Sequence, residues 1–302
     1  MPDPLYTAAL TDADLPGTWK NADEESKRGQ QLTLWLTRGK LGGGLIAAFG
    51  GATSWHVGQL NVSAWTILIG FLAAFICEIA SWQTGCEQVW YEGRAVAESV
   101  KTLSWRFAVG ADPFPSSMKE AQATTLLRQR ISSITQEVSK QIIFDADDAI
   151  VTSKMKDLRR RKFTDRRDAY LLGRTIDQKN WYAAKARQNR RLSFFWRLTL
   201  LTFEVVAILL ATGKVFGGWD IDLTGLLAAI VAAGVAWVAV KQFSPLASAY
   251  SIAANELGTQ ESVLKTVSEE DWPLFVADAE EAISREHTTW LASRTGHLPN
   301  WG

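Results

Sequence analysis

The stretch from Phe194 to Lys241 constrains the fold of this chain more than any other. It consists of two apolar segments joined by a short, glycine-containing turn, Lys214 to Asp222. Each segment approaches the roughly 17–25 apolar residues that an α-helix needs to cross a hydrocarbon core about 30 Å thick. The turn is too short to hold a domain, so both open ends must lie on the same side of a bilayer. The sequence therefore predicts a membrane hairpin.

A second apolar pair lies earlier in the chain, at about residues 41–57 and 64–82. Its first segment is rich in small residues, and Gly43, Ala47 and Gly51 recur at every fourth position, where another helix can pack closely. Tryptophans flank the apolar segments, as is typical where helices leave the hydrocarbon: Trp55, Trp65, Trp82, Trp196, Trp219 and Trp237. We therefore predict an all-α integral membrane protein with two transmembrane helical hairpins, four spans in all, and long cytosolic helices that form a bundle.

The rest of the chain is predicted to be polar helix. A stripe of apolar residues at helical spacing is expected to pack as a coiled coil or bundle: Leu126, Leu127, Ile131, Ile134, Val138, Ile142 and Ile143. The expected organisation is a flexible tail (1–18), a first hairpin unit (19–115), a cytosolic helical connector (116–180), a second hairpin unit (181–265, spans about 195–213 and 223–241) and a C-terminal cytosolic helix (266–302).

The two hairpins have the features of a duplication. Trp19 and Trp181 open the polar lead-in helices, and Trp35 and Trp196 precede the spans, at offsets of 162 and 161 residues. Convergent composition of membrane helices is the alternative explanation.

Charge is distributed unevenly, although the chain has 32 basic and 32 acidic residues. Between Lys154 and Arg191 there are fourteen Lys or Arg against four Asp, whereas from Glu256 to Glu286 acidic residues outnumber basic ones nine to two. These two segments are expected to pair with each other. Basic residues also crowd the outer flanks of the spans, whereas the short turns carry few, so the positive-inside rule places both termini in the cytoplasm.

Motifs of enzymes and metal sites are missing from the sequence. The three histidines are His56, His287 and His297, and no CxxC, HExxH, phosphate loop or nucleophile elbow occurs. Cys77 and Cys86 would be about 13 Å apart on one helix, too far for a disulfide, which fits a reducing compartment. We expect no enzymatic activity, no metal and no cofactor.

Acidic residues inside the predicted spans are the most informative single positions. Glu78 lies in the cytoplasmic third of the second span and Glu204 near the middle of the third, with Arg197 two helical turns before it on the same face. A carboxylate in hydrocarbon costs a few kcal/mol on insertion scales, so such groups face a bundle interior, a partner or water. These three residues are candidate pore-lining or intramembrane polar groups. The alternative is that Glu204 is protonated or hydrogen-bonded between helices and serves only structure.

A basic run in the connector is a candidate site for the phosphates of a nucleotide or of anionic lipid. Its members are Arg159, Arg160, Arg161, Arg166 and Arg167. The alternative is a solvated helix face that pairs with the acidic C-terminal helix.

Several segments resemble the SLATT family of bacterial two-transmembrane effector domains. The resemblance is carried by RTIDQKNWYAAKARQNRRLSFFWR, by the hairpin after it and by the ending EEDWPLFVADAEEAISREHTTWLASR. The first half, with WYEGRAVAESVKTLSWRFAVGADPF after its hairpin, is similar to another branch of the family. The resemblance covers nearly everything from Trp19 to Arg294 and implies nucleotide-signalled conflict systems, in which such domains are proposed to form pores. Many members have one hairpin beside a sensor, whereas this chain has two hairpins and no recognisable sensor.

The expected function is a pore or ion channel of the bacterial inner membrane, acting as a homo-oligomer in antiphage defence. The expected partners are the lipid bilayer and further copies of the chain, with a nucleotide second messenger or a separate sensor protein as candidates, and no nucleic acid. A non-conducting membrane scaffold that recruits a cytosolic partner is the main alternative. A transporter is less favoured, because no proline breaks the spans.

Overall fold

The computed structural model describes residues 9–136, 142, 144, 149–217, 223–281 and 283. The chain forms two compact units, each built from separated stretches of sequence. Met1–Gly29, Gln88–Ala186 and Ser248–Gly302 make up one, here called the bundle unit, and Gln30–Glu87 and Arg187–Ala247 make up the other, the hairpin unit.

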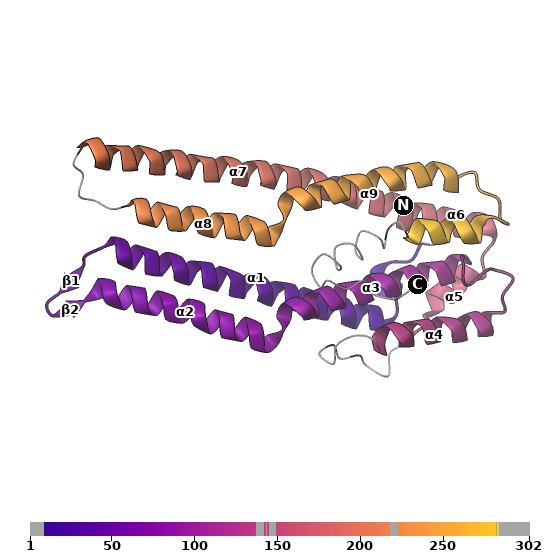
Figure 1. The fold of residues 1–302 in the computed structure, drawn as a ribbon. Helices are drawn as coiled ribbons and strands as arrows, with labels where there is room; N and C mark the ends of the chain where they lie inside the picture. Colours follow the sequence, from indigo (N-terminus) through magenta and orange to yellow (C-terminus); the bar gives the residue numbers. More distant parts are fainter. Residues whose placement is uncertain are drawn as a thin grey trace, which may run out of the picture. The chain divides into compact units, whose positions relative to one another are not determined.

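Helices dominate both units (Figure 1). In chain order the elements are η2 (Asp12–Asp14), α1 (Gly17–Ala52), β1 (His56–Val57), β2 (Leu60–Asn61), α2 (Val62–Thr84), α3 (Cys86–Val109), α4 (Glu120–Gln136), α5 (Ser153–Arg159), α6 (Phe163–Tyr170), the π-helix η3 (Leu171–Ile176), α7 (Asp177–Gly217), α8 (Thr224–Lys241) and α9 (Phe243–Leu264). Residues 272–281 are also helical. The all-α prediction is confirmed; within the described part of the chain the only sheet is the two-residue ladder β1–β2.

The first hairpin consists of α1 and α2, which pack backbone to backbone through glycine. A Cβ atom placed on Gly43 would lie 2.6 Å from the carbonyl oxygen of Gly70, and one placed on Gly70 would lie 2.6 Å from the amide nitrogen of Ala47. A Cβ atom on Gly51, which the sequence pattern placed on the same ridge as Gly43, would meet nothing within 4 Å, so Gly51 lies off the contact, whereas Gly50 is on it. Only glycine, which has no Cβ atom, lets the two helix axes come this close.

The predicted connector between these helices contains the β ladder, which the sequence analysis did not foresee. Gly58 adopts a left-handed φ of 61° in the turn between β1 and β2. The side chain of Asn61 then accepts a hydrogen bond from the amide of Ala64 at 3.0 Å and caps the start of α2.

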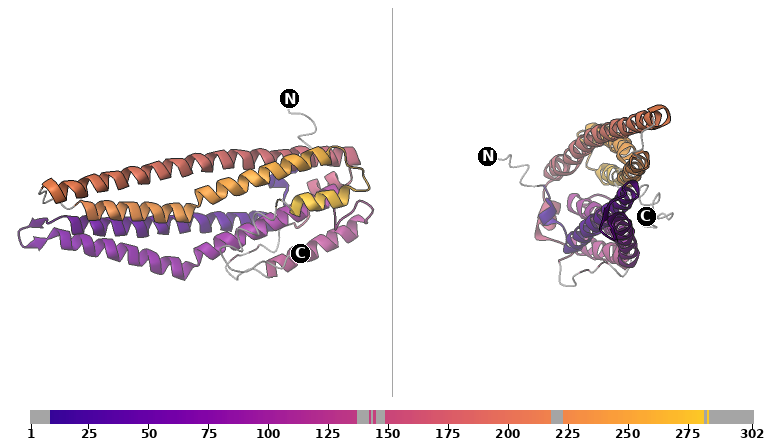
Figure 2. Two further views of the ribbon diagram at one scale, coloured as in Figure 1. Left: turned by 45° about the horizontal axis from the view of Figure 1, so that its top comes forward. Right: turned by 90° about the vertical axis from the view of Figure 1, so that its left-hand side faces the viewer.

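The second hairpin consists of α7 and α8, which run antiparallel (Figure 2). Its predicted turn lies partly outside the described residues, at 218–222. Contact here is through side chains: a Cβ on Gly234 would meet the Leu200 side chain at 2.6 Å. The most apolar 18-residue stretch of the helix that contains α7 has no buried residue: its side chains are exposed or partly exposed.

Among the described residues three helices, not the four predicted spans, are long and apolar enough to cross a membrane by length and composition. They are the helix Val62–Thr84, the continuous helix Phe163–Gly217 and the helix Thr224–Leu264. The predicted span at 41–57 belongs to α1 and ends at Ala52. It falls short because glycines dilute its apolar side chains and two basic residues, Arg38 and Lys40, directly precede it.

Each hairpin is followed by a single residue in the left-handed conformation. Gly85 (φ 54°) separates α2 from α3, and Gln242 (φ 50°) separates α8 from α9. Cys77 and Cys86, which were expected on one helix, therefore lie on different helices, and both thiols are free. Left-handed geometry costs a non-glycine residue about 1–2 kcal/mol. The recurrence of this break in both hairpins supports the predicted duplication.

The core of the bundle unit confirms the predicted apolar stripe. Leu127, Ile131 and Ile134 are buried on α4, and they join side chains of α3 and of the helical residues 272–281 in one continuous core. Two members of the stripe, Val138 and Ile143, lie outside the described residues. The stripe therefore packs into a bundle.

The N-terminal segment differs from the loose tail expected for residues 1–18. Leu10 and Leu15 are buried, the carboxylate of Asp14 accepts a hydrogen bond from the amide of Thr11 at 2.9 Å, and the hydroxyl of Thr152 donates to the Asp14 carbonyl at 2.7 Å. Residues 1–8 lie outside the described range. Two leucines five residues apart and the T-x-x-D pattern of a capping box were the sequence signals for this packing.

Candidate functional site

Glu204 lies well inside the apolar part of α7, where its side chain is exposed. Large apolar side chains around it, including Leu201, Val205 and Ile208, are also exposed. Among the described residues Glu204 makes no hydrogen bond or ion pair. Arg197 is exposed on the same helix two turns earlier, and no ion pair joins the two residues. A single chain thus presents the Glu204 carboxylate among exposed apolar side chains of α7.

Glu78, the other acidic residue predicted to lie within a span, has a partner. Its carboxylate on α2 forms an ion pair with the ammonium of Lys40 on α1, at 2.8 Å. No residue pattern pointed to this pair, because the register of α1 against α2 is set by the glycine contact between the helices. Glu78 is therefore compensated within its own hairpin, whereas Glu204 is not.

A cation–π contact joins the two hairpins within the hairpin unit. The guanidinium of Arg38 on α1 lies 5.3 Å from the ring centroid of Trp237 on α8 and 5.4 Å from that of Trp35. Such contacts contribute about 0.5–2 kcal/mol, depending on how far the cation is desolvated. Arg38 thus ties the first hairpin to the second.

In the basic run of the bundle unit, Arg159 is turned inward. It is 8% exposed, and its guanidinium donates to the carbonyl oxygens of Phe107, Phe114, Pro115 and Met118 at 2.7–3.3 Å. Burial, and then the neighbouring positive charge of Arg166, lower the pKa of Arg159. A guanidinium stays protonated despite such a shift, so the buried Arg159 links the end of α3 to the segment that follows it.

The other members of the run are mostly paired. Arg166 donates to the Val109 carbonyl and forms an ion pair with Glu269, both at 2.9 Å. Arg160 holds Glu120 through two hydrogen bonds, at 2.8 and 2.9 Å, and this contact lowers the pKa of the Glu120 carboxyl. Arg167 contacts Asp168 at 3.3 Å, while Arg161 is exposed and makes no ion pair with the residues that the structure describes. A phosphate site on this run stays a prediction.

Pairing between the basic and the acidic segment is confirmed. Three ion pairs connect them: Arg166 with Glu269, Lys179 with Glu261, and Arg174 with Glu280. The first two are at least partly exposed, whereas the third is completely buried in the bundle unit.

The Arg174–Glu280 pair is the centre of a hydrogen-bond network that was not predicted from the sequence. Nε and Nη2 of Arg174 donate to the two carboxylate oxygens of Glu280 at 2.9 and 2.8 Å. The hydroxyls of Tyr170 and Thr102 donate to the same carboxylate at 3.0 and 2.9 Å. Arg174 lies in the π-helix η3, a widened turn that often marks a functional position. No local pattern singles out this arginine among fourteen basic residues of its segment.

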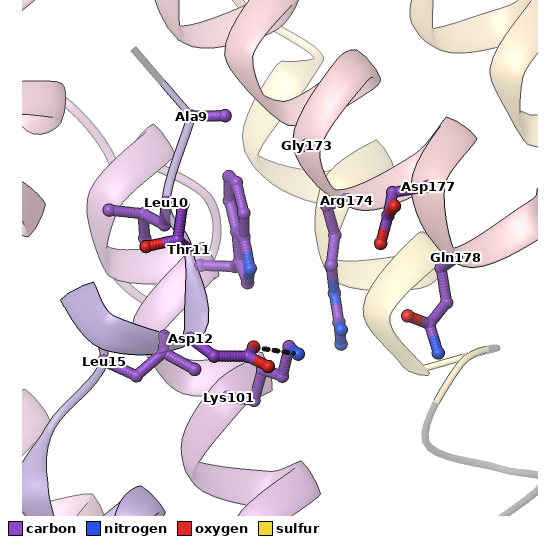
Figure 3. A pocket seen from close by; sticks show the side chains of 11 residues that line it. Ala9, Leu10, Thr11, Asp12, Leu15, Lys101, Gly173, Arg174, Asp177 and Gln178 are labelled. Carbon is purple, nitrogen blue, oxygen red and sulfur yellow. Dashed lines mark hydrogen bonds and ion pairs between the residues drawn. The ribbon is translucent and has the colours of Figure 1, made fainter. Parts of the chain in front are cut away.

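A pocket opens beside this network, with a volume of about 240 Å³ (Figure 3). Leu10, Thr11 and Asp12 of the N-terminal segment line one wall together with Lys101 of α3, and Arg174, Asp177 and Gln178 line the other. Asp12 and Lys101, both on the first wall, form an ion pair at 2.8 Å.

Comparison with protein families confirms the resemblance found in the sequence. The family model for the SMODS and SLOG-associating 2TM effector domain 3 matches residues 16–167, and the model for domain 1 of the same series matches residues 170–290. No curated protein and no solved structure matches the chain significantly. Together the two matches cover both hairpins and most of the bundle unit. The chain belongs to the family of SMODS- and SLOG-associating two-transmembrane effector domains, and it carries two of these domains in tandem.

Proposed function

We propose that this protein is a pore or ion channel of the bacterial inner membrane, which assembles from several copies and permeabilises the membrane in nucleotide-signalled conflict defence. It acts without catalysis. The observation that carries the proposal is Glu204, an exposed and unpartnered carboxylate on the apolar surface of α7.

Energetics makes a lipid-facing position for Glu204 costly. An acidic side chain at the centre of a spanning helix costs about 2.5–3.5 kcal/mol on insertion scales. Within one chain the hairpin unit offers Glu204 no cation or donor among the described residues. Assembly around an axis removes the penalty, because the α7 face then borders water or a neighbouring subunit. A ring of carboxylates at such an axis favours cations.

The four-span topology belongs to this proposal. The bundle unit contains the chain on both sides of the first hairpin, Met1–Gly29 and Gln88–Ala186. If α2 crosses the bilayer, α1 must cross it as well for the chain to return. The part of α1 in the hairpin unit, residues 30–52, is about 34 Å long, sufficient for a 30 Å core. By the positive-inside rule the bundle unit and both termini are cytoplasmic.

Helix continuity supports gating of the pore by the bundle unit. α1 and α7 each run without interruption from the bundle unit into the hairpin unit, whereas Gly85 and Gln242 interrupt the two returning helices. A rigid helix transmits displacement between units, and a single left-handed residue absorbs it. Each hairpin thus has one helix that continues unbroken into the bundle unit and one that is interrupted by a left-handed residue.

Reconstitution in liposomes tests the proposal. The purified chain is expected to release an encapsulated fluorescent cation indicator under an activating condition, and Glu204→Gln is expected to lower cation selectivity without loss of assembly. Glu270→Gln, at an exposed residue of the bundle unit, is the matched control and should behave as the parent. Direct imaging should show a closed ring of subunits.

Liposomes that release no indicator under any condition would refute the proposal. A monomer or dimer by imaging, together with a soluble protein that co-purifies in stoichiometric amounts, would instead establish the membrane scaffold.

A further inference from the structure

The pocket of the bundle unit is lined by two groups of opposite charge, Arg174 and Asp177, that each lack a hydrogen-bond or ion-pair partner among the described residues for part or all of the side chain. Arg174 is 1% exposed, and its Nη1 has no hydrogen-bond acceptor among the described residues, because Glu280 engages only Nε and Nη2. An unsatisfied buried donor costs about 1–3 kcal/mol, more when it is charged. On the same wall Asp177 is exposed and makes no hydrogen bond or ion pair with a described residue. One group lacks an acceptor and the other lacks a cation.

The remaining charges of the pocket are already matched. Asp12 neutralises Lys101 on the same wall, and Glu280, which does not line the pocket, neutralises Arg174. Once Glu280 is counted against Arg174, Asp177 is the one charged residue of the lining that no described residue neutralises. A simple anion would satisfy Arg174 but would be repelled by Asp177, and a simple cation would leave the Arg174 donor unsatisfied. A ligand that carries both charges matches both groups.

Apolar side chains complete the lining and set the ligand's size. Ala9, Leu10, Leu15 and the ring of Trp105 contribute to the walls, and Gln178 adds an amide that can donate and accept. A volume of 240 Å³ corresponds to about eight water molecules at roughly 30 Å³ each. It is smaller than the roughly 300–1,000 Å³ of pockets for drug-sized ligands, so a dinucleotide does not fit.

We propose that this pocket is a regulatory binding site for a small zwitterion of amino-acid size. The ligand's carboxylate accepts from Nη1 of Arg174, its ammonium group lies at Asp177, and its side chain packs against Leu10, Leu15 and Trp105. Because the N-terminal segment forms one wall, binding orders this segment against η3 and the start of α7. The proposal does not depend on pore formation, since it concerns binding to the bundle unit alone.

Calorimetric titration of the full chain in detergent micelles, with each of the twenty common L-amino acids as probe, tests the site. At least one is expected to bind. For each amino acid that binds, two analogues are titrated as well: the amine that lacks the carboxylate and the acid that lacks the ammonium group. Each analogue is expected to bind at least tenfold more weakly than the amino acid. Acetate and inorganic phosphate serve as probes that carry negative charge only.

Variants locate the binding to this pocket. Asp177→Asn, at an exposed residue outside the core, is expected to weaken binding at least tenfold, and Gln178→Trp is expected to block it by filling the pocket. Glu270→Gln is the matched control and should bind as the parent does. Circular dichroism on each variant checks that the helices are intact.

The proposal is overturned if no amino acid binds, if either single-charge analogue binds as tightly as the zwitterion, or if Asp177→Asn binds like the parent. These outcomes are independent of conductance. A chain that binds a zwitterion but never conducts would support this site and refute the pore. A chain that conducts but binds no zwitterion would support the pore and refute this site.

Discussion

Replacement of Glu280 by alanine removes the carboxylate at the centre of the most buried polar network in the described chain. Four hydrogen bonds end on this carboxylate, two from Arg174 and one each from Tyr170 and Thr102. Both charges of the ion pair are buried, with exposed side-chain fractions of 1% for Arg174 and 0% for Glu280. The substitution leaves the guanidinium in the core without the carboxylate that it is hydrogen-bonded to. Alanine favours helix, so the backbone itself is not penalised.

The expected loss follows from the isolated charge. Removing one partner of a buried ion pair destabilises a protein by about 3–5 kcal/mol, because the remaining charge stays desolvated. For a domain of 150–250 residues each kcal/mol lowers the melting temperature by about 2–4 °C, so Glu280→Ala is expected to lower it by roughly 6–20 °C. Thermal unfolding in detergent micelles, followed by tryptophan fluorescence, measures the change. Trp272 reports on this region, since its ring lies 5.8 Å from that of Tyr170.

A double variant separates the loss of the pair from the loss of packing. Arg174→Met combined with Glu280→Leu replaces both charges with apolar side chains, and it is expected to recover most of the stability lost in Glu280→Ala. Glu270→Ala, at an exposed neighbour, should change the melting temperature little. If Glu280→Ala melts within about 2 °C of the parent, less than 1 kcal/mol by the same conversion, the reasoning about this network is wrong.

Two further predictions concern the hairpin contact and the response to acid. Gly43→Leu should disrupt the first hairpin, because the carbonyl of Gly70 lies against Gly43. Gly44→Leu should be tolerated, because a Cβ atom on Gly44 meets nothing within 4 Å. Size-exclusion chromatography compares the yields of folded protein, and equal yields would contradict the contact. The hydrogen bond from Arg160 lowers the folded-state pKa of Glu120, so the stability that it contributes is fully present above the pKa of an unfolded glutamate, about 4.3, and is lost as the pH falls through the lower folded value. Glu120→Gln should therefore weaken the dependence of the melting temperature on pH in this acidic range, and an unchanged acid profile would show that the pair has no effect on stability.

Local patterns in the sequence were sufficient for the helical architecture. The apolar runs around Glu204, the stripe on α4 and the opposed charges of two segments each depend on residue spacing or composition, which the chain carries without reference to its partners. The structure confirms the stripe and the charge pairing, and the family matches confirm the resemblance and the tandem organisation. The same patterns overestimated α1 as an apolar span, because its glycines serve contact between helices and add little hydropathy.

Tertiary structure alone decided which polar groups have partners. Glu78 and Glu204 look alike in sequence, yet the register of α1 against α2 brings Lys40 to the first and no described residue to the second. Among many arginines only the meeting of η3 with the helix at residues 272–281 selects Arg174 for burial with Glu280. Spacing along a chain determines which face of a helix is apolar, whereas the charge that meets a given side chain depends on which helices come together and in what register.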